Sequence, residues 1–195
     1  MDLLPFIKEY QREFYLVGGT AIALHIGHRR SIDFDLFKKG SLNSKKIKEK
    51  IYQSAFQKTL IHEESDQLHF NIHDVKVTFF SFGFEIPHTL KFNNVITLPS
   101  LLDLSAMKAF ALGRRAKWKD YIDLYYIFKL HFTLNDISIR AEELFADIFS
   151  AKLFRQQLCF FEDIDYSEDV EFMDGFSVSE EVVKKYLIDI ATTPF

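Results

Sequence analysis

Two acidic side chains and a pair of glycines are the residues of this sequence best suited to chemistry. Asp33 and Asp35 lie two apart in residues 31–37 (SIDFDLF). Residues i and i+2 of an extended strand point to the same face, about 6–7 Å apart, so this segment predicts a strand that holds both carboxylates side by side. Adjacent negative charges favour a cation between them. Mg²⁺ prefers oxygen ligands of this kind and completes its shell with substrate phosphates.

The glycine turn Gly18–Gly19 precedes these carboxylates and is followed by Thr20, which is expected near the N-cap of a helix. Backbone N–H groups at a helix N-terminus can receive a phosphate. Each pattern alone has a simpler interpretation, because glycine can merely supply a positive φ and an exposed strand often carries solvated acids. Together the two patterns predict a metal-dependent site for a nucleoside triphosphate.

Hydrophobic periodicity predicts an α+β protein, with an N-terminal mixed sheet and its helices followed by a C-terminal helical bundle. The predicted strands are residues 14–17, 31–37, 59–63, 67–73, 75–82 and 95–98. The predicted helices are residues 2–12, 20–28, 42–57, 100–114, 118–131, 135–149, 151–161 and 178–192. The change of character near residue 95 divides the chain into an α/β domain, residues 1–95, and a helical domain, residues 96–195.

The composition is that of a folded chain with a large core. Of its 195 residues, 48% are apolar and 16% aromatic, which excludes global disorder. The net charge of −4 selects no class of partner, but the charge is unevenly spread. Residues 28–58 carry nine Lys or Arg against three acids, whereas residues 161–181 carry nine acids and no base. The basic segment is either a solvated face or a surface that attracts an anionic acceptor such as RNA.

Cysteine use and hydropathy indicate where the protein works. The single cysteine, Cys159, excludes an intramolecular disulfide and fits a reducing compartment. The first residues lack the pattern of a signal peptide, and no apolar run approaches the roughly 20 residues that span a bilayer. We therefore expect a cytoplasmic protein with no membrane partner. The seven histidines show no ligand spacing, so zinc is not expected.

Two segments resemble a known family. Residues 16–37 (LVGGTAIALHIGHRRSIDFDLF) resemble the opening motif of the AbiEii/AbiGii-type nucleotidyltransferase toxins, whose superfamily is related in fold to DNA polymerase β. Residues 103–124 (DLSAMKAFALGRRAKWKDYIDL) are similar to the helical motif of that family, in which a lysine is followed by Lys-Asp-x-x-Asp. The resemblance covers roughly residues 14–130, and its first block is the more specific.

The resemblance implies a reaction and a set of site residues. The reaction is the Mg²⁺- or Mn²⁺-dependent transfer of a nucleoside monophosphate from an NTP to an RNA acceptor, tRNA included, or to a protein. The family also implies a toxin with a cognate antitoxin as its partner. The residues assigned in this way are Asp33 and Asp35 as metal ligands, Gly18, Gly19 and Thr20 at the triphosphate, and Lys108 and Asp120 in catalysis.

Other charges of the second block have two interpretations. Arg114 and Arg115 lead a basic cluster that can bind a triphosphate or an RNA backbone, or can simply be cations favoured at a helix C-terminus. Lys108 has leucines near its helical face, which favours a position at a protein surface or cleft over open water. Asp120 and Asp123 share a helix face and can equally be acids favoured at a helix N-terminus.

One position departs from the superfamily pattern. Superfamily enzymes usually carry a third acid on a later strand, and residues 74–80 (DVKVTFF) place Thr78 there. Threonine cannot act as a base at neutral pH, so either Asp120 or Asp123 substitutes or the chemistry is weakened. An active nucleotidyltransferase is the first hypothesis. The alternatives are a catalytically degenerate fold that binds a nucleotide or partner, and an interaction module that uses the uneven charge.

Overall fold

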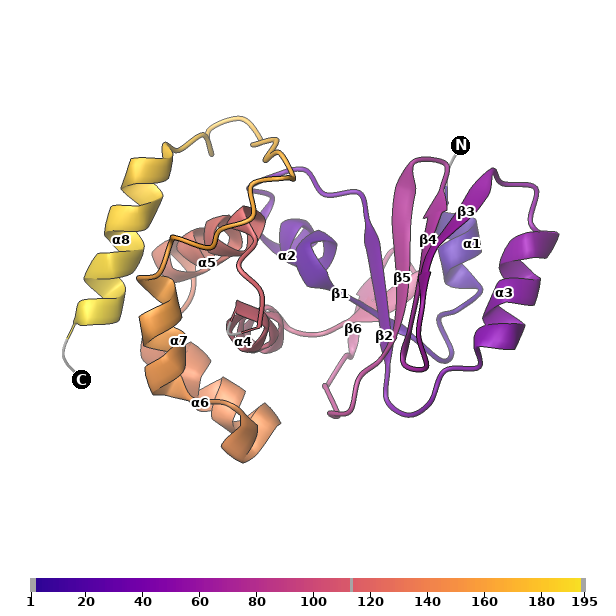
Figure 1. Cartoon of the computed structure of the whole chain (residues 1–195), viewed down its shortest axis with the longest axis horizontal. Helices are drawn as coiled ribbons and strands as arrows, with labels where there is room; N and C mark the ends of the chain where they lie inside the picture. Colours follow the sequence, from indigo (N-terminus) through magenta and orange to yellow (C-terminus); the bar gives the residue numbers. More distant parts are fainter. Residues whose placement is uncertain (1–2, 113, 194–195) are drawn as a thin grey trace. The chain divides into compact units, whose positions relative to one another are not determined.

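The contacts within the chain divide it into two units, and each is described by itself. The computed structural model describes residues 3–112 and 114–193. Unit 1 contains the described residues of Met1–Ala21 together with Ser31–Ser100, and unit 2 contains Ile22–Arg30 and the described residues of Leu101–Phe195 (Figure 1). The division into domains at residues 95 and 96 stays a prediction.

Unit 1 is built on a seven-stranded mixed sheet with the order β3-β4-β5-β2-β1-β7-β6. The pairs β1–β7 and β2–β5 are parallel, whereas the other four pairs are antiparallel. The strands are β1 (Tyr15–Val17), β2 (Phe34–Lys38), β3 (Lys58–Glu63), β4 (Gln67–Ile72), β5 (Val75–Ser81), β6 (Leu90–Phe92) and β7 (Ile96–Leu98).

One face of this sheet forms the core of unit 1. It carries fully buried apolar side chains at alternate positions of the central strands, namely Leu36, Leu68, Phe70, Ile72, Val77 and Phe79. Helices α1 (Leu4–Lys8) and α3 (Ser44–Gln53) lie on one side of the sheet (Figure 1). The ring of Tyr10, just after α1, is tilted against that of Phe79 with centroids 4.8 Å apart, and the ring of Tyr52 of α3 lies 6.0 Å from that of Phe70. The opposite face carries polar residues such as Asp35, Thr78 and His69, together with the aromatic pair Phe37 and Phe80.

Unit 2 is helical and is centred on α5 (Trp118–Leu130), in which residues 120–128 are all buried. The other helices are α4 (Leu101–Leu112), α6 (Leu134–Phe145), the 3₁₀ turn η1 (Ala146–Ile148), α7 (Ala151–Leu158) and α8 (Glu180–Thr192). Local sequence explains where they begin, because Thr133 and Asp136 form a capping box at α6 and Ser179 caps α8. Helix α2 (Gly18–Ile26) begins in unit 1, and its last five residues belong to unit 2.

The structure confirms the predicted fold class, an α+β chain with an N-terminal mixed sheet and a mostly helical C-terminal part. Three local predictions are wrong. Strand β2 begins at Phe34, so Asp33 lies just before it. Helix α2 begins at Gly18, two residues before the predicted start, so Thr20 lies within its first turn. Strand β6 was not predicted because it has only three residues, two of them exposed. Asp2 and Gly113, in two predicted helices, lie outside the described residues.

Candidate active site

Gly18 sits where the end of β1 meets Asp35 of β2. Val17 and Asp35 are paired residues of these antiparallel strands. Gly18 has φ +72°, and a Cβ atom placed on it would lie 2.1 Å from Oδ2 of Asp35. Only a glycine permits both this backbone conformation and this approach of the carboxylate. The start of α2 and one carboxylate of the predicted metal site are thus adjacent.

Asp33 is held by the backbone of a neighbouring strand. Its Oδ1 atom accepts a hydrogen bond from the backbone N–H of Lys76 at 3.1 Å, and the side chain is half-buried. The hydroxyl of Thr20 lies 2.9 Å from that of Ser31 and donates to the backbone carbonyl of Asp33. These bonds fasten the segment before β2 to the first turn of α2, and so they fix where Asp33 stands.

The donor set of this site fits a hard cation. Asp33 and Asp35 contribute carboxylate oxygens, and Asp33 uses one of its two for Lys76. Among residues 3–112 and 114–193, no group of three or more His, Cys, Asp or Glu side chains is arranged to hold a metal ion. A cation bound by these two carboxylates would therefore draw further oxygens from a substrate, as Mg²⁺ does from phosphates.

Lys108 lies in the buried interior of unit 2 between two aspartates. Its Nζ atom is 2.7 Å from Oδ1 of Asp120 and 2.9 Å from Oδ2 of Asp123, and about 4% of its side chain is exposed. Burial alone lowers the pKa of the ammonium group, but the two carboxylates outweigh burial and raise the pKa above its ordinary value. Lys108 is therefore a permanent cation that bridges α4 and α5.

Asp123 is the centre of this buried network. It accepts hydrogen bonds from Arg29 at 2.7 and 3.0 Å and lies 2.8 Å from Nε2 of His28. Burial raises the pKa of this carboxyl group, but Lys108, Arg29 and the bond from His28 bring it well below the ordinary value. The sequence interpretation missed His28 and Arg29 as partners of Asp123. Their place inside the first motif, residues 16–37, was the only available signal.

The two predicted nucleotide-binding arginines differ in their surroundings. Nε of Arg115 donates to Oδ2 of Asp120 at 3.1 Å, while 53% of the Arg115 side chain is exposed. The guanidinium of Arg114 lies over the ring of Phe110, 3.6 Å from its centroid, and donates to the Phe110 carbonyl at 2.9 Å. Arg115 is therefore joined to the Lys108–Asp120 pair, whereas Arg114 is held on α4.

A comparison with known protein families covers the residues described above. The sequence profile of the family "Nucleotidyl transferase AbiEii toxin, Type IV TA system" matches residues 7–177. The chain belongs to this family. The AbiEii match includes Gly18, Asp33, Asp35, Lys108 and Asp120, and it extends beyond the two segments that carried the resemblance.

Single proteins are similar to this chain in sequence or in fold. Protein aq_aa25 of Aquifex aeolicus is 29% identical over 166 residues, which is 82% of this chain and 80% of that protein. MenT4, a nucleotidyltransferase toxin of Mycobacterium tuberculosis, has a similar fold with a TM-score of 0.60 at 12% identity, over 92% of this chain and 74% of that one. JHP933 from Helicobacter pylori has a TM-score of 0.53 at 15% identity, over 95% and 85% of the two chains.

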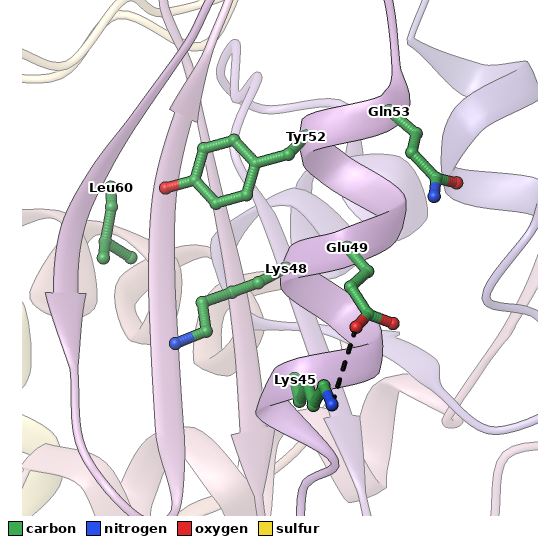
Figure 2. Close-up of a pocket in the computed structure, with 6 residues that line it drawn as sticks. All are labelled: Lys45, Lys48, Glu49, Tyr52, Gln53 and Leu60. Carbon is green, nitrogen blue, oxygen red and sulfur yellow. Dashed lines mark ion pairs between the residues drawn. The ribbon is translucent and has the colours of Figure 1, made fainter.

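The AbiEii chain also has a pocket away from the predicted site. It lies beside α3 and β3 and is lined by Lys45, Lys48, Glu49, Tyr52, Gln53 and Leu60 (Figure 2). Lys48 pairs with Glu63 at 2.6 Å, and Lys45 pairs with Glu49 at 4.0 Å. The lysines of this basic helix are thus largely matched by local acids. None of the described helices is long and apolar enough to cross a membrane.

Proposed function

We propose that this AbiEii-family protein transfers a nucleoside monophosphate from an NTP to an RNA or protein acceptor and releases pyrophosphate. Asp33 and Asp35 hold Mg²⁺, or Mn²⁺, which supplies neutralisation of the triphosphate charge when bound. The observation that carries this proposal is the approach of Asp35 to Gly18, because it puts a carboxylate ligand beside the first N–H groups of α2. A triphosphate needs both a cation and such donors.

The start of α2 binds the triphosphate in this proposal. Gly18 and Gly19 offer backbone N–H groups at the N-terminus of the nine-residue helix. Thr20 is proposed to bind the triphosphate through its backbone, because its hydroxyl is already bonded to Ser31 and to the Asp33 carbonyl. Its side chain serves the site by keeping Asp33 in place.

Lys108, Arg114 and Arg115 supply the cationic part of the machinery in this proposal, and Asp120 is the carboxylate that binds two of these cations. An ammonium group has three donors, and Asp120 and Asp123 use two of those of Lys108. Since only about 4% of its side chain is exposed, Lys108 is proposed to act by holding Asp120 in place. Asp120 orients both Lys108 and the half-exposed guanidinium of Arg115. Stabilisation of the charge that develops on transferred phosphates is the main demand of this reaction class.

The proposed biological setting follows from the family and the composition. As a type IV toxin, the protein has a cognate antitoxin as its partner and acts in the cytoplasm, which the single cysteine suits. The acceptor is proposed to be an RNA, with tRNA among the candidates, or a protein. The alternative is a catalytically degenerate fold that binds nucleotide without turnover. Thr78 favours it, since β5 carries this hydroxyl directly beside Asp35.

A label-transfer assay tests the proposal. The full chain is incubated with Mg²⁺ or Mn²⁺, each radiolabelled NTP in turn and total cellular RNA, beside the variants Asp33→Ala and Asp66→Ala. Asp66 is an exposed acid between β3 and β4 and serves as the matched control. Label on RNA or protein with the wild type and Asp66→Ala, but not with Asp33→Ala, supports the enzyme. Nucleotide binding without any transfer by the wild type would support the degenerate fold instead.

A further inference from the structure

The polar face of the sheet carries a histidine in register with Asp35. Asp35 of β2 is paired with Thr78 of β5, and Thr78 is paired with His69 of β4. Paired residues of adjacent strands share a face of a sheet. Their sequence neighbours, such as Leu36, Phe79 and Leu68, are fully buried on the opposite face. Asp35, Thr78 and His69 therefore form one row across three adjacent strands.

A short chain of hydrogen bonds fixes the tautomer of His69. Nε2 of Gln67 donates to Oε2 of Glu64 at 2.8 Å, and since a carboxylate only accepts, this orients the Gln67 amide. Oε1 of Gln67 then faces Nε2 of His69 at 3.2 Å. An amide oxygen cannot donate, so Nε2 of His69 carries the proton and Nδ1 carries the lone pair.

Burial and the neighbouring charged groups favour the neutral form of the His69 ring. Burial lowers the pKa of His69, and Lys76 on β5 and His62 on β3 lower it further, against the opposing effect of Glu64. The rings of His62 and His69 are 5.3 Å apart. On the face of the sheet that carries His69, the carboxylates on the other side of Thr78 are those of Asp33 and Asp35. A neutral imidazole of low pKa can accept a proton at neutral pH.

We propose that His69 is the general base that activates the acceptor hydroxyl, in the place of the acid that Thr78 replaces. This inference rests on the proposed nucleotidyl transfer. Adjacent strands are about 4.8 Å apart, so roughly 10 Å separate the backbones of Asp35 and His69. In this proposal the acceptor hydroxyl lies beside Thr78, which has the smallest side chain of the row. Gln67 is a positioning residue, since it acts through the His69 ring.

The proton and electron pairs balance in this step. The O–H bond of the acceptor breaks and its proton moves to Nδ1 of His69. The acceptor oxygen forms a bond to the α-phosphorus, and the bond from that phosphorus to the oxygen bridging to the β-phosphate breaks. The electron pair of that bond leaves with pyrophosphate. His69 then returns its proton to solvent.

Rates of label transfer by the full-length variants His69→Gln and His88→Gln test the inference. His88 is an exposed histidine of unit 1 that stacks on Tyr15 at 4.3 Å, and it is the matched control. We expect His69→Gln to lose activity about 10²–10³-fold, as for other general bases, with NTP binding by calorimetry unchanged. The wild-type rate should fall at acidic pH as His69 is protonated, and His69→Gln should lose this pH dependence. Adding Thr78→Asp to His69→Gln should recover activity by supplying a carboxylate beside Asp35.

The possible results separate the role of His69 from the proposed function. Transfer by His69→Gln at the wild-type rate would overturn the role of His69 and leave the proposed function standing. Absence of transfer by the wild type at every pH would overturn both. If His69→Gln does not fold, two other measurements test the inference. They are the fall of the wild-type transfer rate at acidic pH and the shift of that fall in Gln67→Leu, in which the tautomer of His69 is no longer fixed. A wild-type rate that does not change across the histidine range would then overturn the inference.

Discussion

Oδ2 of Asp35 occupies the space in which a side chain on Gly18 would begin. A Cβ atom at position 18 would lie 2.1 Å from that oxygen and 3.0 Å from the carboxyl carbon. The chain can therefore keep either a side chain at position 18 or the carboxylate of Asp35 where it stands, but not both. The glycine turn and the carboxylate pair, which are 17 residues apart in the sequence, are one structural unit.

Gly18→Ala should displace Asp35 and abolish metal-dependent NTP binding. The variant should also lose about 1–2 kcal/mol of unfolding free energy, because an alanine at positive φ is strained. Gly40→Ala is the matched control, since Gly40 has φ +84° but open space where its Cβ would lie. It should show the loss of stability alone. Urea denaturation and calorimetry with Mg²⁺ and NTP measure the two effects. Equal NTP binding by both variants would contradict a role for the Gly18–Asp35 contact.

Removal of divalent metal should stop transfer without unfolding the protein. In the proposed function the cation at Asp33 and Asp35 binds together with the triphosphate, so its removal should affect substrate binding and leave the fold intact. Excess EDTA should therefore leave the Tm of the free protein unchanged and abolish both transfer and the rise in Tm that NTP produces. The measurement is thermal unfolding with and without EDTA, each with and without NTP. An EDTA-induced fall in the Tm of the free protein would contradict this account.

Most of the fold was predictable because its elements are long and strongly periodic. The alternating pattern of β4 and the apolar spacing of α6, α7 and α8 are strong local signals. The failures are short segments decided by distant contacts. Asp33 leaves the strand pattern because its carboxylate binds the backbone of Lys76, which is 43 residues away in the sequence. The short stretch of sequence around Asp33 cannot reveal that hydrogen bond.

The sequence indicates the residue types of the proposed site better than it indicates their contacts. The spacing of Asp33 and Asp35 and the nearby glycines indicated a phosphate–metal site. Sequence spacing could not show that Lys108 is buried between two aspartates, nor that His28 and Arg29 approach Asp123 across 94 to 95 residues of sequence. The register that aligns His69 with Thr78 likewise depends on strand pairing, which only the folded sheet defines.

Arg115→Ala should weaken NTP binding while leaving most of the stability intact. The side chain is half-exposed and its partner Asp120 keeps Lys108. Loss of one phosphate contact should raise the Kd about tenfold at low salt, equivalent to about 1.4 kcal/mol. The difference should shrink as salt is added, because salt screens charges near a surface. Calorimetry at two ionic strengths measures this, with the exposed Arg12→Ala as control. If Arg12→Ala raised the Kd equally, the weaker binding of Arg115→Ala would come from the change in net charge and not from a specific phosphate contact.

Asp123→Asn should strongly destabilise unit 2. The change removes the carboxylate charge that Lys108 and Arg29 share, and leaves two cations buried without full compensation. Breaking one partner of a buried ion pair typically costs about 3–5 kcal/mol. Asp147→Asn, at an exposed position of η1, should stay within about 0.5 kcal/mol of the wild type. Urea denaturation of the three proteins measures the effect, and equal midpoints for both variants would contradict it.

The same carboxylate should make the stability of the wild type depend on pH in the acid range. The pKa of Asp123 is well below its ordinary value in the folded protein, so its stabilisation is fully present above the unfolded pKa of about 3.9. It is lost as the pH falls through the lower, folded value, because the unfolded chain then binds the proton first. The difference in unfolding free energy between the wild type and Asp123→Asn should therefore be constant near neutrality and narrow below about pH 4. Urea denaturation at a series of pH values measures it, and a difference that stays constant into strong acid would show that Asp123 is not held as a carboxylate.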